Sequence, residues 1–129
     1  MSDLHPLKVA LLVGLGGGLG ALTRHYVGAG AKRWLGEGWP IGTLVVNLIG
    51  SLVLGVLAGC VASRQSVSAE TRAFVMVGFL GALTTFSTFS VEGVTLLREA
   101  ASPVSGLAYI GVSVVAGLAL AYLGYRLGS

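Results

Sequence analysis

The chain has 129 residues, of which 54% are hydrophobic and only 10% are charged, and its mean hydropathy is +0.88. Soluble globular domains carry about 25% charged residues, so this composition excludes an ordinary soluble enzyme or binding module. The net charge of +3 is small and scattered, which argues against a nucleic-acid partner. The single cysteine, Cys60, offers neither a disulfide nor a thiolate metal site.

The first apolar stretch, residues 9–23, is short for a transmembrane helix, which needs about 20 mostly apolar residues. It continues past Arg24 through residues 26–31, so we expect a helix that is tilted or interrupted near Arg24. Three longer stretches contain no charged residue at all. The sequence therefore predicts an all-α membrane protein with a single four-helix transmembrane domain over residues 1–129, its helices spanning about 7–35, 41–63, 69–98 and 103–126.

Local signals support these helix ends. Trp34 and Trp39 are typical of the membrane interface, and Pro40 suits the first position of the second helix. Ser68 is expected to cap the third helix, with Glu70 in its first turn, where a carboxylate stabilises the helix dipole.

The distribution of basic residues does not predict which way the chain is oriented in the membrane. With four helices, one side of the membrane holds Lys8, Arg64, Arg72 and Arg126, and the other holds Lys32, Arg33 and Arg98. Lysine and arginine in short loops normally accumulate on the cytoplasmic side. A near-even split is either a weak signal in a small protein or a sign of dual topology, in which oppositely inserted chains pair as an antiparallel homodimer.

Polar residues recur at helical spacing inside three of the predicted helices. Positions four residues apart share one helix face. The residues are Thr43, Asn47 and Ser51 in the second helix, Ser105, Tyr109 and Ser113 in the fourth, and Thr84, Thr85, Ser87, Thr88 and Ser90 in the third. Such groups often hold helices together. Three stripes at once favour a solvated or ion-lining track instead.

The residue types in these stripes favour an anion. No acidic residue lies in the middle of a predicted helix, and Glu92 comes nearest, about one turn after Phe89. Cation selectivity by side chains requires acidic groups. Amide and hydroxyl donors are present instead, beside Phe86 and Phe89, whose ring edges carry partial positive charge.

The segment from Gly81 to Thr85 predicts a break in the third helix. Glycine weakens the helix, and threonine hydroxyls compete for backbone carbonyls. Carbonyl groups freed in this way are ligands for Na⁺. In an antiparallel dimer two such breaks would meet on the two-fold axis around one central ion.

Three segments carry a resemblance to a known family. They are Gly17-Gly18-Leu19-Gly20-Ala21-Leu22-Thr23-Arg24, Gly42-Thr43-Leu44-Val45-Val46-Asn47-Leu48-Ile49-Gly50 and the run from Gly78 to Ser90. Together they resemble the Fluc/CrcB family of fluoride channels over the whole length of the chain.

The resemblance implies a dual-topology homodimer in the bacterial cytoplasmic (inner) membrane. Its two pores would export fluoride passively, with no enzyme activity, and would confer fluoride resistance. It further implies roles for individual residues: Asn47, Phe86, Phe89, Thr43, Ser87, Thr88, Tyr109 and Ser113 in the pore, Glu92 at the end of the polar track, Arg24 near an aqueous vestibule, and the carbonyls of Gly81 and Thr84 on a structural Na⁺ at the dimer interface.

Two other functions compete with this interpretation. A small dual-topology exporter of organic cations has similar length and helix number, but it needs a membrane-embedded glutamate in the first helix, and residues 9–23 contain none. A non-transporting scaffold subunit would need only the glycine contacts between helices.

Overall fold

The computed structural model describes residues 4–65, 67–99 and 103–129, and the elements found there are helical. Four spans are long and apolar enough to cross a membrane, which confirms the predicted all-α membrane protein. The first, second and fourth spans are single helices, and the third is built from four consecutive segments. The elements are α1 (Pro6–Leu35), α2 (Ile41–Ala62), α3 (Ala69–Thr71), the π-helix η1 (Arg72–Leu80), α4 (Gly81–Leu83), α5 (Phe86–Glu99) and α6 (Pro103–Gly128).

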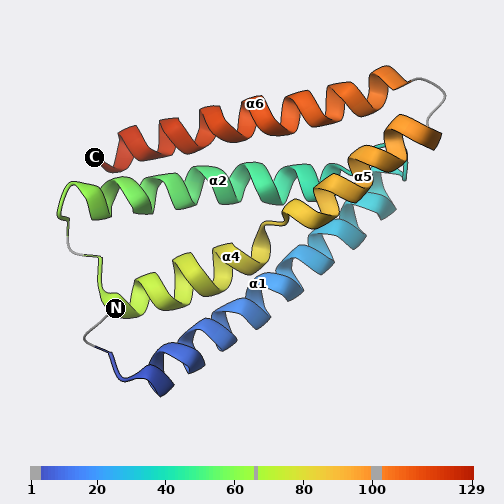
Figure 1. The fold of residues 1–129 in the computed structure, drawn as a ribbon. Coiled ribbons are helices and arrows are strands. Elements are labelled where there is room, and N and C mark those ends of the chain that lie inside the picture. Colours follow the sequence, from blue (N-terminus) through green and yellow to red (C-terminus); the bar gives the residue numbers. More distant parts are fainter. Residues whose placement is uncertain (1–3, 66, 100–102) are drawn as a thin grey trace.

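Helix α1 is continuous through Arg24, so the alternative of an interruption there is wrong. Its 30 residues give a length of about 45 Å at 1.5 Å per residue, more than the roughly 30 Å hydrocarbon core. A helix longer than the membrane is thick accommodates the difference by tilting. In Figure 1, α1 crosses the bundle obliquely, as this mismatch requires.

The third span begins with the predicted cap. Ser68 Oγ accepts a hydrogen bond from the backbone N–H of Thr71 at 3.1 Å, and Glu70 lies in the first turn. Helix α2 begins at Ile41, as its predicted span required, but Pro40 occupies the N-cap position and not the first helical position expected for it.

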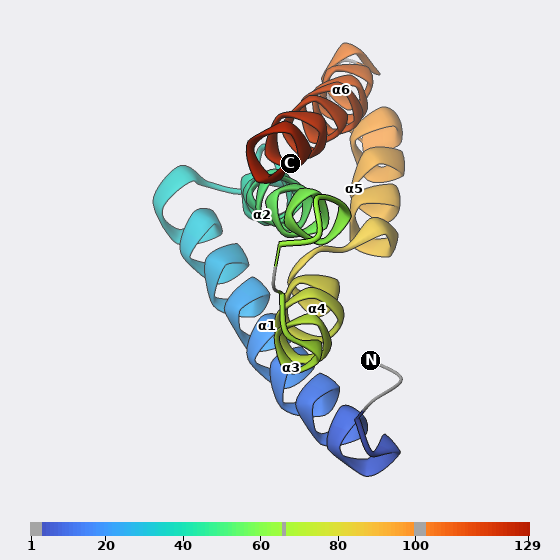
Figure 2. The same cartoon turned by 90° about the vertical axis from the view of Figure 1, so that its left-hand side faces the viewer.

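The third span then departs from α-helical geometry twice. Its first half, Arg72–Leu80, is a π-helix. After α4 ends at Leu83, Thr84 takes an extended backbone conformation with φ −80° and ψ 156°, and α5 begins at Phe86. The chain changes direction at this point, so that η1 and α4 lie against α1 whereas α5 lies against α6 (Figure 2).

Glycines allow the closest helix contacts. A Cβ atom added at Gly20 would overlap the Phe79 carbonyl oxygen of η1, and one added at Gly59 in α2 would overlap the Tyr125 carbonyl oxygen of α6. Backbones that approach this closely are held by van der Waals contact, because lipid provides no hydrophobic driving force between helices. By contrast, a Cβ atom added at Gly14 or at Gly18 would have no atom of another described element within 4 Å.

The bundle has two distinct ends. The start of α1, the α2–α3 connection and the end of α6 lie together, on the left of Figure 1, and the α1–α2 connection lies at the opposite end. At the first end Lys8 Nζ and Glu70 Oε1 form an ion pair at 2.7 Å. Both side chains are about half exposed, so water and salt screen this pair and it contributes little to stability.

The glycine contacts predict a selective effect of added methyl groups. We expect Gly20→Ala to lower the unfolding free energy by about 1–3 kcal/mol, because the new Cβ overlaps backbone of η1 that cannot move independently. Gly14→Ala is the matched control on the same helix, since nothing lies within 4 Å of its added Cβ. Thermal unfolding of both variants in detergent measures the difference, and equal losses would contradict this packing.

Candidate functional site

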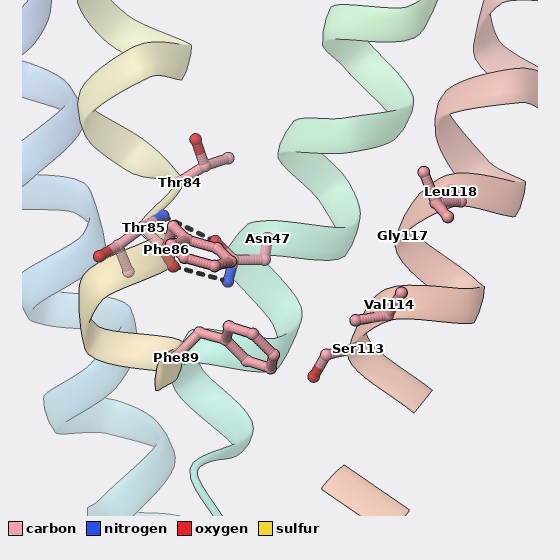
Figure 3. A pocket seen from close by; sticks show the side chains of 9 residues that line it. All are labelled: Asn47, Thr84, Thr85, Phe86, Phe89, Ser113, Val114, Gly117 and Leu118. Carbon is pink, nitrogen blue, oxygen red and sulfur yellow. Dashed lines mark hydrogen bonds between the residues drawn. The ribbon is translucent and has the colours of Figure 1, made fainter. Parts of the chain in front are cut away.

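The centre of the site is a two-way hydrogen bond between Asn47 and the backbone of Thr85. The side-chain Oδ1 of Asn47 accepts from the Thr85 N–H at 2.8 Å, and its Nδ2 donates to the Thr85 carbonyl oxygen at 3.1 Å (Figure 3). Because a backbone N–H only donates, the amide oxygen of Asn47 must face it, and the orientation of the amide is fixed. Asn47 thereby supplies the partners that Thr85 lacks where the helix is interrupted.

Asn47 also lines a cavity of about 370 Å³ between the third span and α6 (Figure 3). The cavity is lined by Asn47, Thr84, Thr85, Phe86, Phe89, Ser113, Val114, Gly117 and Leu118. None of these residues is charged. The cavity thus combines apolar walls with a few polar groups.

Two hydrogen-bond donors at this cavity are unused. A carboxamide NH₂ has two N–H groups, and within the described chain only one N–H of Asn47 has a partner. The Ser113 hydroxyl oxygen is buried and makes no hydrogen bond to any described residue. A buried polar group without a partner costs about 1–3 kcal/mol, so the Ser113 hydroxyl favours a bound water or anion in the cavity, to which the second N–H of Asn47 can also donate.

Phe86 and Phe89 form the aromatic part of the same cavity. Their ring centroids lie 5.7 Å apart, and both rings extend from the start of α5 (Figure 3). Phe89 is half-buried and its ring also lies 5.6 Å from that of Tyr109, whereas the Phe86 side chain is 80% exposed. One wall of the cavity is therefore open to the outside of the chain.

Beyond Phe89, three polar residues from three helices meet. Thr43 Oγ1 donates to Glu92 Oε1 at 2.8 Å, and the hydroxyl of the fully buried Tyr109 donates to Glu92 Oε2 at 2.9 Å. A carboxyl group at membrane depth is stable only when its oxygens are hydrogen-bonded, and here each oxygen has a partner. We call Thr43, Glu92 and Tyr109 the carboxyl triad.

Trp39 supports this triad, and sequence analysis assigned it only to the membrane interface. Its Nε1 donates to Ser105 Oγ at 2.8 Å, and its ring lies edge-on to Tyr109 with 6.1 Å between centroids. The four-residue spacing of Trp39 from Thr43 could not have shown this, because Trp39 precedes the first residue of α2, Ile41, and helical spacing does not apply to it.

Ser87 and Thr88, which sequence analysis assigned to the pore, do not line the cavity. Thr85 Oγ1 accepts from the Thr88 N–H at 3.3 Å and donates to Thr88 Oγ1 at 3.0 Å, so it caps the start of α5. Ser87 Oγ lies 3.5 Å from the same Thr85 oxygen. Their pore role stays a prediction.

The residues predicted around a cation, Gly81 and Thr84, lie just before the interruption and at it, and Thr84 also lines the cavity. The Thr85 N–H, which would bond the Gly81 carbonyl in a continuous helix, bonds Asn47 instead. Arg24 Nη1 donates to the Thr84 carbonyl oxygen at 3.2 Å and does not line the cavity. Among the described residues no group of three histidine, cysteine or acidic side chains could hold a metal, so a cation here would rely on backbone oxygens.

Comparison with known proteins places the chain in a family. The family model described as CrcB-like protein, Camphor Resistance (CrcB), matches residues 11–125. The chain is 49% identical over 115 residues to a fluoride-specific ion channel FluC of Hyphomonas neptunium, covering 88% of this chain and 90% of that protein. It is 47% identical over 120 residues to fluoride-specific ion channel FluC 2 of Rhodococcus jostii, covering 92% and 97% respectively. The chain therefore belongs to the CrcB family of fluoride-specific ion channels, as its sequence motifs indicated.

Proposed function

We propose that the chain forms a passive, fluoride-selective channel that exports fluoride from the cytoplasm. The observation that carries the proposal is the uncharged cavity in which the second N–H of Asn47 and the hydroxyl of Ser113 have no partner among the described residues, beside two phenylalanine rings. The family membership of the chain supports the same function.

Neutral donors suit the chemistry of fluoride. A conducting pore must replace part of the ion's hydration shell yet bind it weakly enough to release it. Amide and hydroxyl groups donate hydrogen bonds without the strong fixed attraction of a buried cation. The edges of Phe86 and Phe89 add weak positive potential, because an aromatic ring is negative on its face and positive at its edge.

The proposed path leads from the cavity past Phe89 to the carboxyl triad. The Phe89 ring contacts Tyr109, whose hydroxyl bonds Glu92, and Glu92 in turn bonds Thr43. Ser87 and Thr88 would extend the path at the start of α5. In this arrangement Asn47 has two tasks: it holds the Thr85 backbone and it presents one N–H to the ion.

A second copy would complete the cavity. Phe86 lines it but is 80% exposed, so part of the wall has to come from outside the chain. We propose an antiparallel homodimer of dual topology with two pores, each lined by phenylalanines of both copies. The near-even split of basic residues between the two ends supports insertion in both orientations.

A structural Na⁺ at the dimer axis fits the backbone near the interruption. The Gly81 carbonyl has lost the Thr85 N–H, and among the described residues the Thr84 carbonyl accepts from Arg24 alone, which leaves one of its two lone pairs. Two carbonyls are too few to replace the hydration of a cation, and a second copy would double them. The guanidinium of Arg24, expected near a vestibule, would lie beside this ion.

Export needs no energy source beyond the membrane potential. Hydrogen fluoride is a weak acid that crosses membranes in its neutral form and ionises in the more alkaline cytoplasm, where fluoride accumulates. A passive pore in the inner membrane of a bacterium would then expel the anion and confer resistance. The rival cation exporter is not favoured, because α1 contains no acidic residue.

Fluoride efflux from liposomes tests the function. We expect efflux of fluoride but not of chloride, and a loss of at least about tenfold in Asn47→Asp and in Phe86→Ile. The first variant puts a negative charge in the cavity and removes the donor to Thr85, and the second removes an aromatic edge. Leu107→Met, an exposed position on α6 outside the cavity, is the control. Full flux in both cavity variants would contradict the site.

Cysteine labelling tests the topology. In a Cys60→Ala background, Gln65→Cys and Gly38→Cys mark opposite ends of the bundle, and both positions are exposed. Dual topology predicts that an impermeant thiol reagent added to intact cells labels about half of each variant. Complete labelling of one variant and none of the other would establish a single orientation and contradict the antiparallel dimer.

Thermal unfolding tests the Na⁺ site without measuring transport. A ligand that binds only the folded protein stabilises it, by about 2.7 kcal/mol at 100 times its dissociation constant. We expect purified protein to unfold at a higher temperature in sodium chloride than in potassium chloride of equal ionic strength. The same unfolding temperature in both salts would argue against a site for Na⁺.

A further inference from the structure

A second hollow, of about 280 Å³, lies where α1 ends and α2 begins. It is lined by Lys32, Glu37, Trp39, Pro40, Val91, Glu92, Thr95 and Leu96. Its walls are more polar than those of the phenylalanine cavity, and three of its residues carry ionisable side chains. The proposed path so far ends at Glu92, which is one of the residues that line this hollow.

The hollow adjoins the carboxyl triad directly. Glu92 belongs to both, because its carboxylate binds Thr43 and Tyr109 while the residue also lines the hollow. Trp39 lines the hollow and packs edge-on against Tyr109. The triad therefore has the hollow on one side and Phe89, with the phenylalanine cavity, on the other.

The charges around the hollow present a difficulty for an anion. Lys32 is the one cationic side chain among the residues that line the hollow. The same hollow is lined by two residues with carboxyl groups, Glu37 and Glu92. Without Lys32 the hollow would hold acidic groups alone and would repel a small anion. The neighbouring Arg33 belongs to the same helical turn but does not line the hollow.

We propose that this hollow is an entrance to the fluoride path and that Lys32 makes it passable to an anion by offsetting Glu37 and Glu92. The inference rests on the proposed fluoride function and assigns a new role to Lys32. A lysine in the last turn of a helix also stabilises the helix dipole, but that role applies equally to Arg33. The two residues therefore make a matched pair for a test.

Charge at an entrance acts on the rate of arrival of an ion, and salt screens this effect. A local potential changes the concentration of a small ion at a cleft by about tenfold or more at low ionic strength. The screening length is about 20–30 Å near 0.01–0.02 M salt and falls to a few ångströms near 1 M. An entrance charge thus has a salt-dependent signature that a packing defect lacks.

The experiment measures fluoride efflux at pH 7 from liposomes with valinomycin, using potassium gluconate to set ionic strength at about 20 mM or about 500 mM. We expect Lys32→Gln to reduce the low-salt rate by about threefold or more and to approach the wild-type rate at high salt. Glu37→Gln should raise the low-salt rate, and the double variant Lys32→Gln/Glu37→Gln should return it toward the wild-type value. Arg33→Gln should leave it unchanged.

The results that would contradict the role of Lys32 differ from the result that would contradict the proposed function. If Lys32→Gln and Arg33→Gln lower the rate equally, or if the loss in Lys32→Gln persists at high salt, then the charge of Lys32 does not control the entry of fluoride. If Glu37→Gln fails to compensate, the charge balance of the hollow is not what matters. These results overturn the inference while the wild-type channel still conducts. A wild-type protein that releases no fluoride would overturn the proposed function itself.

Discussion

The structure depends on how the backbone N–H and carbonyl of Thr85, a residue inside the membrane, find hydrogen-bond partners. Thr85 follows an extended residue, so its N–H has no helical acceptor at that point, and its carbonyl lies at the start of α5. In lipid, an unpaired backbone group costs several kcal/mol. The Asn47 carboxamide matches both groups, with one acceptor and one donor at hydrogen-bonding distance. The interruption of the third span is stable because a side chain of the second span completes it.

This one interaction organises the groups around it. It lets α5 start in a new direction, which brings Phe86 and Phe89 beside Ser113 of α6 (Figure 3). It leaves the Gly81 carbonyl without its helical donor, and it fixes the Asn47 amide so that its second N–H has no partner in the described part of the chain. A helix that continued through Thr84 would offer none of these groups. The arrangement of donors is thus a consequence of how the break is closed.

Much of this was predictable from residue types and spacing. Long apolar stretches predict the four spans, Ser68 predicts the start of the third, and the four-residue spacing of Thr43 and Asn47 puts both on one face. The partners were not predictable, because they depend on contacts between distant segments. Periodicity contains no sign that Asn47 binds backbone rather than another side chain, or that Arg72–Leu80 forms a π-helix. Helical pattern alone also could not decide whether α1 continues through Arg24.

Amide hydrogen exchange at Thr85 tests the central interaction most directly. Thr85 is buried and its N–H is bonded only through Asn47 among the described residues, so its exchange in the unmodified protein should be slow. In Asn47→Ala the same N–H loses its acceptor, and we expect its exchange to accelerate about tenfold or more, while amides in the middle of α2 keep their rates. Equally slow exchange at Thr85 in both proteins would contradict the account.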